Sequence, residues 1–161
     1  MPTKITPNLW FDTEAEEAAG FYTSVFDNSR IVSVTHYPED APRPAGMVMT
    51  VEFELDGQRF VGINGGPQFK FDEAVSFQID CETQDEIDSY WERLSDGGSE
   101  GPCGWLKDRY GLSWQVAPTG MEELFADPDP TRAQRAMAAM LKMGKIDIAE
   151  LRRAADGVPA A

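Results

Sequence analysis

The stretch "KDRYGLSWQVAP", residues 107–118, reads as a charged turn, one glycine and a short strand. In that strand Trp114 and Val116 alternate with Gln115. Because successive side chains of a strand point to opposite faces, the apolar residues predict a buried face and place the amide of Gln115 on the other one. What an amide does on that second face is the first functional question that the sequence raises.

The residues before this strand complete a module. Val75–Cys81 alternates as a strand, and Gln84–Ser95 carries apolar residues at helical spacing before Gly97 and Gly98 end it. Glu100–Lys107 and Leu112–Ala117 read as two further strands. The order is therefore a strand, a helix and more strands.

The same order occurs earlier in the chain. The expected strands are Ile5–Phe11, Arg30–Tyr37, Met47–Leu55 and Arg59–Ile63. The expected helix, Glu14–Phe26, has Asp12 or Thr13 as a candidate cap. Each helix carries an aromatic pair, Phe21-Tyr22 in the first and Tyr90-Trp91 in the second. The pattern predicts an internal duplication and an α+β fold.

The last part of the chain does not belong to the repeat. After a breaker at residues 127–130, helices are expected from Thr131 and over Ile146–Ala155. The predicted organisation is thus paired modules over 1–119 and a C-terminal helical arm over 120–161. Residues 1–129 have a net charge of −17 and residues 130–161 one of +3. This contrast is expected either from solvated helix faces or from an arm that docks on the acidic body of a partner subunit.

The composition excludes some classes of function. A net charge of −14 argues against nucleic acid as a partner, since phosphate binding needs a basic surface. No apolar run approaches the roughly 18 residues of a membrane span, and the N-terminus lacks the pattern of a signal peptide. Two cysteines do not make a disulfide framework. We therefore expect a cytoplasmic protein with reduced thiols and no membrane partner.

Five segments occur in this order along the chain: "NLWFDTEAEEAAGFYTSVF" (8–26), "INGGPQFKFDEAVSFQIDCET" (63–83), "YWERLSDGG" (90–98), "CGWLKDRYGLSWQVAP" (103–118) and "AMLKMGKIDIAEL" (139–151). Together they resemble the PhnB-like family, whose members are often labelled 3-demethylubiquinone-9 3-methyltransferase and which lies within the vicinal-oxygen-chelate superfamily. The resemblance implies two βαβββ modules, about 3–66 and 73–119, whose sheets curl into half-barrels around a cavity, as in glyoxalase and bleomycin-resistance proteins. It also implies a homodimer.

The methyltransferase label would require a site for S-adenosylmethionine, commonly a glycine-rich turn between a strand and a helix. Gly62–Gly66 follows a strand, but Pro67 comes next and no helical pattern follows. The glycine cluster therefore predicts a loop turn, and no cofactor is expected.

The resemblance also implies where a metal would be held: near Pro7, within Val61–Asn64, at Ser76 and at Gln115. Metals of this superfamily prefer imidazole and carboxylate ligands, and the corresponding strands carry neither. We therefore predict a cavity without metal. The amides and the hydroxyl either bind a ligand, satisfy one another or neighbouring backbone, or hold a metal weakly.

The predicted substrate-binding residues are Leu9, Phe11, Asn64, Ser76, Gln78, Trp105 and Gln115. In the first strand Leu9 and Phe11 face the cavity if the ligand position is Pro7, and Asn8 and Trp10 face it otherwise; the first arrangement is preferred.

No catalytic residue is assigned. His36 fits either the surface or a general base at the cavity mouth, and Cys103 either an inert thiol or a nucleophile.

Three functions remain open at this point. The first is an enzyme acting on a small oxygenated or aromatic metabolite, including a metal-dependent glyoxalase or dioxygenase. The second is a metal-free protein that binds such a molecule. The third is the methyltransferase of the family label. The lack of a visible acid–base pair or activated nucleophile favours binding.

Overall fold

The structure is a computed structural model that describes residues 3–160. It divides into two compact units, Met1–Phe71 and Asp72–Ala161, each with its own sheet and its own helix on that sheet.

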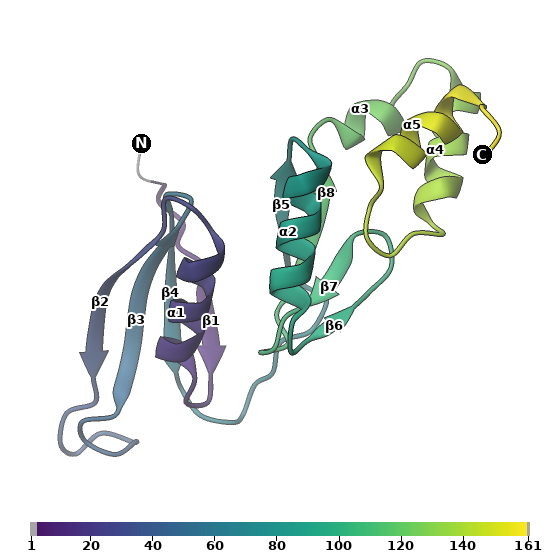
Figure 1. The fold of residues 1–161 in the computed structure, drawn as a ribbon. Helices are drawn as coiled ribbons and strands as arrows, with labels where there is room; N and C mark the ends of the chain where they lie inside the picture. Colours follow the sequence, from purple (N-terminus) through teal and green to yellow (C-terminus); the bar gives the residue numbers. More distant parts are fainter. Residues whose placement is uncertain (1–2, 161) are drawn as a thin grey trace. The chain divides into compact units, whose positions relative to one another are not determined.

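The first unit is a four-stranded sheet with the strand order β1-β4-β3-β2 (Figure 1). Its strands are β1 (Asn8–Phe11), β2 (Arg30–His36), β3 (Val48–Leu55) and β4 (Gln58–Asn64). β1 runs parallel to β4, and the other neighbours are antiparallel. The sheet is therefore mixed, as expected when a helix connects the first strand to the rest of a module.

Helix α1 (Ala15–Val25) covers one face of this sheet. Its buried residues include Ala18 and Tyr22, and the Tyr22 ring stacks on that of Phe53 with centroids 6.2 Å apart. The sequence suggested Asp12 or Thr13 as the N-terminal cap of this helix. In the structure the helix begins after Glu14, whose side chain makes no capping hydrogen bond.

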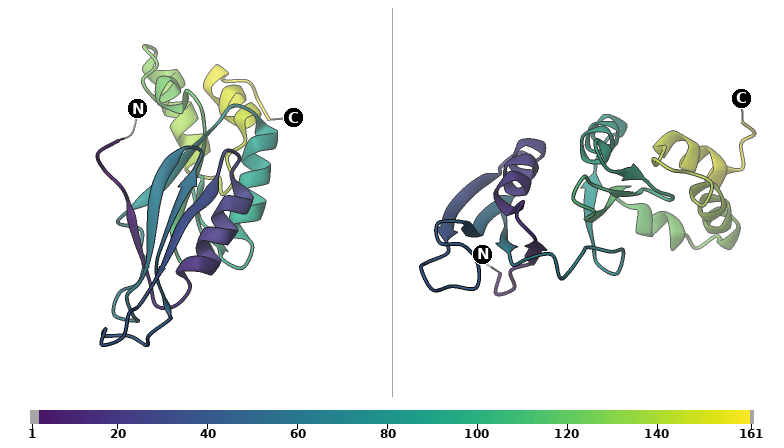
Figure 2. Two further views of the ribbon diagram at one scale, coloured as in Figure 1. Left: turned by 90° about the vertical axis from the view of Figure 1, so that its left-hand side faces the viewer. Right: turned by 90° about the horizontal axis from the view of Figure 1, so that it is seen from below.

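The second unit repeats this topology, with the strand order β5-β8-β7-β6. Its strands are β5 (Ser76–Cys81), β6 (Ser99–Glu100), β7 (Trp105–Lys107) and β8 (Ser113–Pro118). Helix α2 (Gln84–Ser95) lies on one face, as the right-hand view of Figure 2 shows. Thr83 caps α2, its Oγ1 accepting a hydrogen bond from the Glu86 amide at 3.2 Å. The duplication and the α+β class are thereby confirmed.

The turn between β7 and β8 is held by the side chain of Asp108, which is 2% exposed. Its Oδ1 accepts hydrogen bonds from the amides of Tyr110 at 2.8 Å and Leu112 at 3.1 Å. Its Oδ2 accepts from Trp114 Nε1 at 2.9 Å. One buried carboxylate thus holds both the turn and the indole of Trp114 in β8.

The expected strand over Glu100–Lys107 is wrong in its middle, where the chain leaves the sheet between β6 and β7. Cys103 and Gly104 have φ values of +57° and +83°, which a strand does not allow. Their amides donate to the carbonyls of Met143 and Gly144, both at 2.8 Å. Pairing with the C-terminal segment therefore replaces pairing within the sheet.

Three helices follow β8: α3 (Met121–Phe125), α4 (Pro130–Met140) and α5 (Ile148–Asp156). The sequence had not indicated α3. The arm is fastened to its own unit at Ile146, which is fully buried, and by the Gln84 side chain, which bonds the Ile146 carbonyl and the Ile148 amide, each at 2.9 Å. The division into 1–119 and 120–161 stays a prediction. Within residues 3–160, every helix is too short or too polar to cross a membrane.

Candidate functional site: a pocket beside the second sheet

Each sheet has a helix face, covered by α1 or α2, and an opposite face. In the second unit the strand register assigns the opposite face. Ser76 pairs with Ser113, and Gln78 and Trp105 both pair with Gln115. Lys107 pairs with Ser113. Because directly paired residues share a face, four of the predicted site residues, Ser76, Gln78, Trp105 and Gln115, come together there.

Gln115 lies on this opposite face as its alternation with Trp114 and Val116 indicated. Its Nε2 donates a hydrogen bond to Ser76 Oγ at 2.9 Å. Gln78, which is exposed, donates to Asp80 Oδ1 at 2.8 Å. Gln115 and Ser76 therefore satisfy one another in this structure, which leaves their remaining lone pairs and protons for a ligand.

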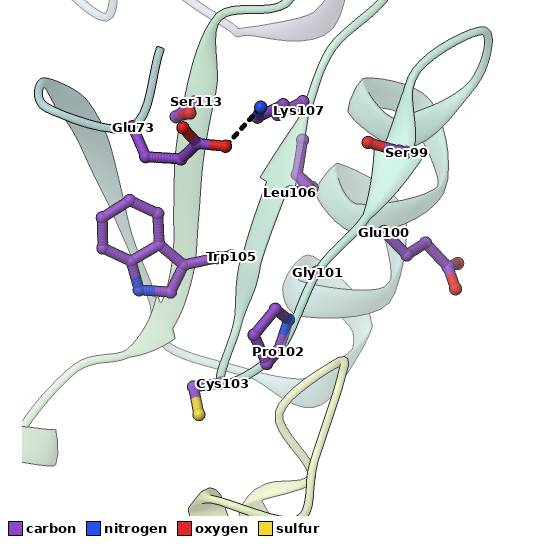
Figure 3. Close-up of a pocket in the computed structure, with 10 residues that line it drawn as sticks. All are labelled: Glu73, Ser99, Glu100, Gly101, Pro102, Cys103, Trp105, Leu106, Lys107 and Ser113. Atoms are coloured by element: carbon purple, nitrogen blue, oxygen red, sulfur yellow. Dashed lines mark ion pairs between the residues drawn. The ribbon is translucent and has the colours of Figure 1, made fainter.

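Beside these residues lies a pocket of about 560 Å³. It is lined by Glu73, Ser99, Glu100, Gly101, Pro102, Cys103, Trp105, Leu106, Lys107 and Ser113, which are drawn in Figure 3. The volume falls within the range of pockets that hold small organic ligands.

The two ends of the pocket differ in chemistry. Pro102 and Cys103 lie at one end, and the half-buried Trp105 presents its ring beside them (Figure 3). At the other end Lys107 forms an ion pair with Glu73. The hydrogen bond from Lys107 holds the pKa of the Glu73 carboxyl below its ordinary value. An apolar, aromatic wall thus leads to a charged end.

Ser113 belongs to the charged end, directly opposite Lys107 in the strand register. It is fully buried, and its Oγ has no hydrogen-bond partner among the described residues. A buried hydroxyl without a partner costs about 1–3 kcal/mol relative to a paired one. Ser113 is nevertheless one of the residues that line the pocket.

The structure places the other predicted site residues in the first unit and on its helix face. Leu9 and Phe11 are buried in the core, and Leu9 pairs with Gly62, where an added Cβ would meet Ala15 of α1 at 3.2 Å. The preferred parity of the first strand was therefore wrong, and Asn8 and Trp10 occupy the opposite face. The helix packs on this face because Gly62 lets Ala15 approach the sheet closely.

Asn64 also lies on the helix face, 2% exposed. Its Oδ1 accepts from the Ala15 amide at 2.9 Å, and its Nδ2 donates to the Val48 carbonyl at 3.0 Å. The amide thus satisfies the first turn of α1, the role that the sequence had given to Asp12 or Thr13.

The glycines after β4 accommodate Trp10. A Cβ on Gly65 would lie 2.2 Å from the Trp10 ring, and Trp10 Nε1 donates to the Gly66 carbonyl at 2.8 Å. A loop without helix follows. The glycines therefore make room for the Trp10 indole, and they do not form the strand-to-helix turn of a cofactor-binding site.

The positions that the superfamily resemblance assigns to metal ligands do not fit a metal in the second unit. Ser76 and Gln115 offer a neutral hydroxyl and a neutral amide, already bonded to each other. Divalent transition metals favour imidazole, thiolate or carboxylate donors. Over residues 3–160, no three His, Cys, Asp or Glu side chains gather where they could hold an ion.

The histidine and the two cysteines lie in different surroundings. His36 is exposed at the end of the edge strand β2, as in the surface alternative. Cys103 is half-buried in the pocket lining, whereas Cys81 is buried at the end of β5. Burial, with Glu86 and Asp80 nearby, raises the pKa of the Cys81 thiol to about 12.

Of the residues that line the pocket, the sequence predicted only Trp105 as a binding residue; Ser76, Gln78 and Gln115 share its face but are not part of the lining. The missed residues include the charged end, Glu73, Lys107 and Ser113. The alternation that places Gln115 on the face opposite the helix also places Ser113 there, and the hairpin partner of Ser113 is Lys107, so both carried a signal. Glu73 lies in the segment between β4 and β5, and no periodicity assigns a direction to its side chain.

The chain is similar to proteins of known structure and to one family model. The model of the family 3-demethylubiquinone-9 3-methyltransferase matches residues 3–117. The PhnB protein from Bacillus cereus, a proposed 3-demethylubiquinone-9 3-methyltransferase, is 40% identical, with a TM-score of 0.65 over 73% of this chain and 100% of that one. No curated protein matches.

Two more distant structures share the fold alone. Protein PA1353 from Pseudomonas aeruginosa is 19% identical, with a TM-score of 0.59 over 72% of this chain and 97% of that one. The fosfomycin resistance protein FosX from Mesorhizobium loti is 14% identical, with a TM-score of 0.56 over 78% and 98%. The duplicated topology, the family model and the Bacillus relative agree, and the chain belongs to the 3-demethylubiquinone-9 3-methyltransferase (PhnB-like) family.

Proposed function

We propose that this protein binds a small aromatic or oxygenated metabolite in the pocket beside the second sheet, without a metal or an organic cofactor. The observation that carries the proposal is the pocket itself. Its volume of about 560 Å³ suits a molecule of one or two rings, and Trp105 offers a ring on which such a molecule can stack.

Polar groups beside the apolar wall support an oxygenated ligand. Ser76, Gln78 and Gln115 lie on the same face as Trp105 and present amide and hydroxyl groups. The FosX protein, named for fosfomycin resistance, shares this fold with little identity, so it supports the fold and not the ligand. Leu9, Phe11 and Asn64 stabilise the first unit and are not included in this proposed site.

Calorimetric titration of the whole chain with a panel of bicyclic aromatic compounds tests the proposal. We expect micromolar to millimolar binding that Trp105→Ala weakens about tenfold, since stacking is worth about 1.4 kcal/mol. Phe69→Ala is the matched control, because Phe69 is an exposed aromatic residue outside the pocket. Equal losses in the two variants, or no binding by any compound, would contradict the proposal.

We also propose that the protein is a homodimer to which the arm contributes, and that it works in the cytoplasm, where its two free thiols remain reduced. On α4 and just after it, Met137 and Leu141 are 38% and 62% exposed. Removing the arm would also remove Ile146 from the core, so a charge is the cleaner change. We expect Leu141→Glu to give a monomer by light scattering, whereas Lys142→Glu leaves the mass unchanged; a dimer in both would exclude the arm.

A further inference from the structure

The charged end of the pocket holds a carboxylate that belongs to the chain itself. Glu73 precedes β5 in an exposed segment, and its carboxylate reaches Lys107, which lines the pocket from β7 (Figure 3). The two side chains are 60% and 40% exposed. Ion pairs between exposed side chains contribute little to stability. A competing anion can therefore replace Glu73 at small cost.

A second hydrogen-bond donor, the Ser113 hydroxyl, lies at the charged end of the pocket. Ser113 is opposite Lys107, fully buried and lacks a hydrogen-bond partner among residues 3–160. The hydroxyl thus has no partner although the Glu73–Lys107 ion pair lies at the same end of the pocket. An O–H donor and an ammonium side by side suit an acceptor that carries a negative charge, because charge-assisted hydrogen bonds are the stronger ones.

The other acidic residue of the lining is directed elsewhere. Glu100 Oε1 accepts a hydrogen bond from Trp91 Nε1 of α2 at 2.9 Å, and Figure 3 shows its side chain pointing away from Trp105. Glu73 is therefore the acidic group that competes for Lys107 at this end of the pocket. The apolar wall begins at Trp105, two residues before Lys107 on the same face of β7.

We propose that the pocket takes an aromatic carboxylate, whose ring packs on Trp105 and whose carboxylate displaces Glu73 to bind Lys107 and Ser113. This inference rests on the proposed function and adds the chemical class of the ligand. Glu73 then acts as an internal competitor for the ligand. It pairs with Lys107 when the pocket is empty, and a ligand carboxylate has to bind Lys107 more strongly than Glu73 does.

The test compares 2-naphthoate with 2-naphthamide, two probes of nearly equal size that differ in charge, by calorimetry on the whole chain. The wild type should bind the carboxylate about tenfold more tightly, as expected for one charge-assisted bond of about 1.4 kcal/mol. Glu73→Gln should raise naphthoate affinity severalfold and leave naphthamide unchanged. Lys107→Gln should abolish the difference between the probes.

Ser113→Ala provides an independent signature. Removing an unpaired buried hydroxyl should leave the unfolding temperature equal or higher, yet weaken naphthoate binding severalfold. If Ser113 had only a structural role, its replacement would lower both the unfolding temperature and the affinity for naphthoate.

The outcomes separate the two proposals. Equal affinity for both probes in the wild type, or weaker naphthoate binding in Glu73→Gln, overturns the carboxylate assignment and leaves the pocket as a site for neutral aromatics. If neither probe binds, the proposed function falls together with this inference.

Discussion

The two units share one topology but use it differently. Between the first and last strands of the first unit, the opposite face presents the pairs Asn8–Val61 and Trp10–Ile63. The equivalent pairs of the second unit are Ser76–Ser113 and Gln78–Gln115. One duplicated face is therefore largely apolar and the other polar. A duplicated fold fixes where side chains point, whereas the residues at those positions decide which half can bind a polar ligand.

The equivalent hairpins show the same divergence. In the first unit β3 and β4 are joined by Asp56 and Gly57, both with positive φ, the conformation of a two-residue hairpin turn. In the second unit β7 and β8 are joined by a longer turn that depends on Asp108. The first turn is specified by local backbone preference and the second by one buried side chain.

The largest expected effect is therefore on the second turn. Asp108→Ala removes the acceptor of two turn amides and of the Trp114 indole, and we expect the free energy of unfolding to fall by about 3 kcal/mol. Asp108→Asn keeps one acceptor oxygen and should cost about half as much. Chemical denaturation of the two variants provides the measurement. A change below about 0.5 kcal/mol for the alanine variant would show that the turn does not need this carboxylate.

Next in size is the contrast between the two amides of the last strands. Asn64→Ala removes the acceptor of the Ala15 amide and the donor to Val48, so unfolding should become easier by about 2 kcal/mol. Gln115→Ala, at a half-buried position, should change stability by no more than about 0.5 kcal/mol. Denaturation curves for both variants test this difference. If Gln115→Ala is the more damaging change, the assignment of structural and ligand-facing amides is reversed.

The smallest expected effect is a difference in reactivity between the two thiols. Cys81 is buried, whereas Cys103 lies in the pocket lining. Burial raises the pKa of Cys81 to about 12, so almost none of it is thiolate at pH 8. We expect a disulfide reagent to modify one thiol per native chain, Cys103, and to reach Cys81 only as fast as the protein unfolds. The Cys103→Ser variant should then show no rapid reaction. Rapid labelling of that variant would place Cys81 outside the core.

Much of the fold is readable in the sequence, because it rests on periodic patterns. The strands and both module helices follow the alternation or helical spacing of their apolar residues. The exceptions have long-range causes: the expected strand over Glu100–Lys107 is interrupted because Cys103 and Gly104 bond to Met143 and Gly144. Patterns of neighbouring residues cannot predict a contact with a segment about forty residues further along the chain.

The site was partly readable for the same reason. Gln115 could be assigned to the face opposite the helix because it alternates with Trp114 and Val116, whereas Trp105 was chosen as a bulky residue beside small ones that could line a pocket. The first strand misled because Leu9 and Phe11 alternate with Asn8 and Trp10, so each face offers an apolar side chain. Only the packing of α1 on Leu9 and Phe11 decides between them. Glu73 was not predictable, because its contact with Lys107 depends on the path of a loop.

The central claim, that the second unit and not the first holds the ligand, is tested most directly by the four tryptophan indole N–H signals in a nitrogen-15 NMR titration with 2-naphthoate. The indoles of Trp10, Trp91 and Trp114 donate to Gly66, Glu100 and Asp108, respectively, whereas Trp105 lines the pocket. We predict a large, saturable shift of the Trp105 signal and an unchanged Trp10 signal. A saturable shift of Trp10 with Trp105 unmoved would contradict the account and place the ligand on the first unit.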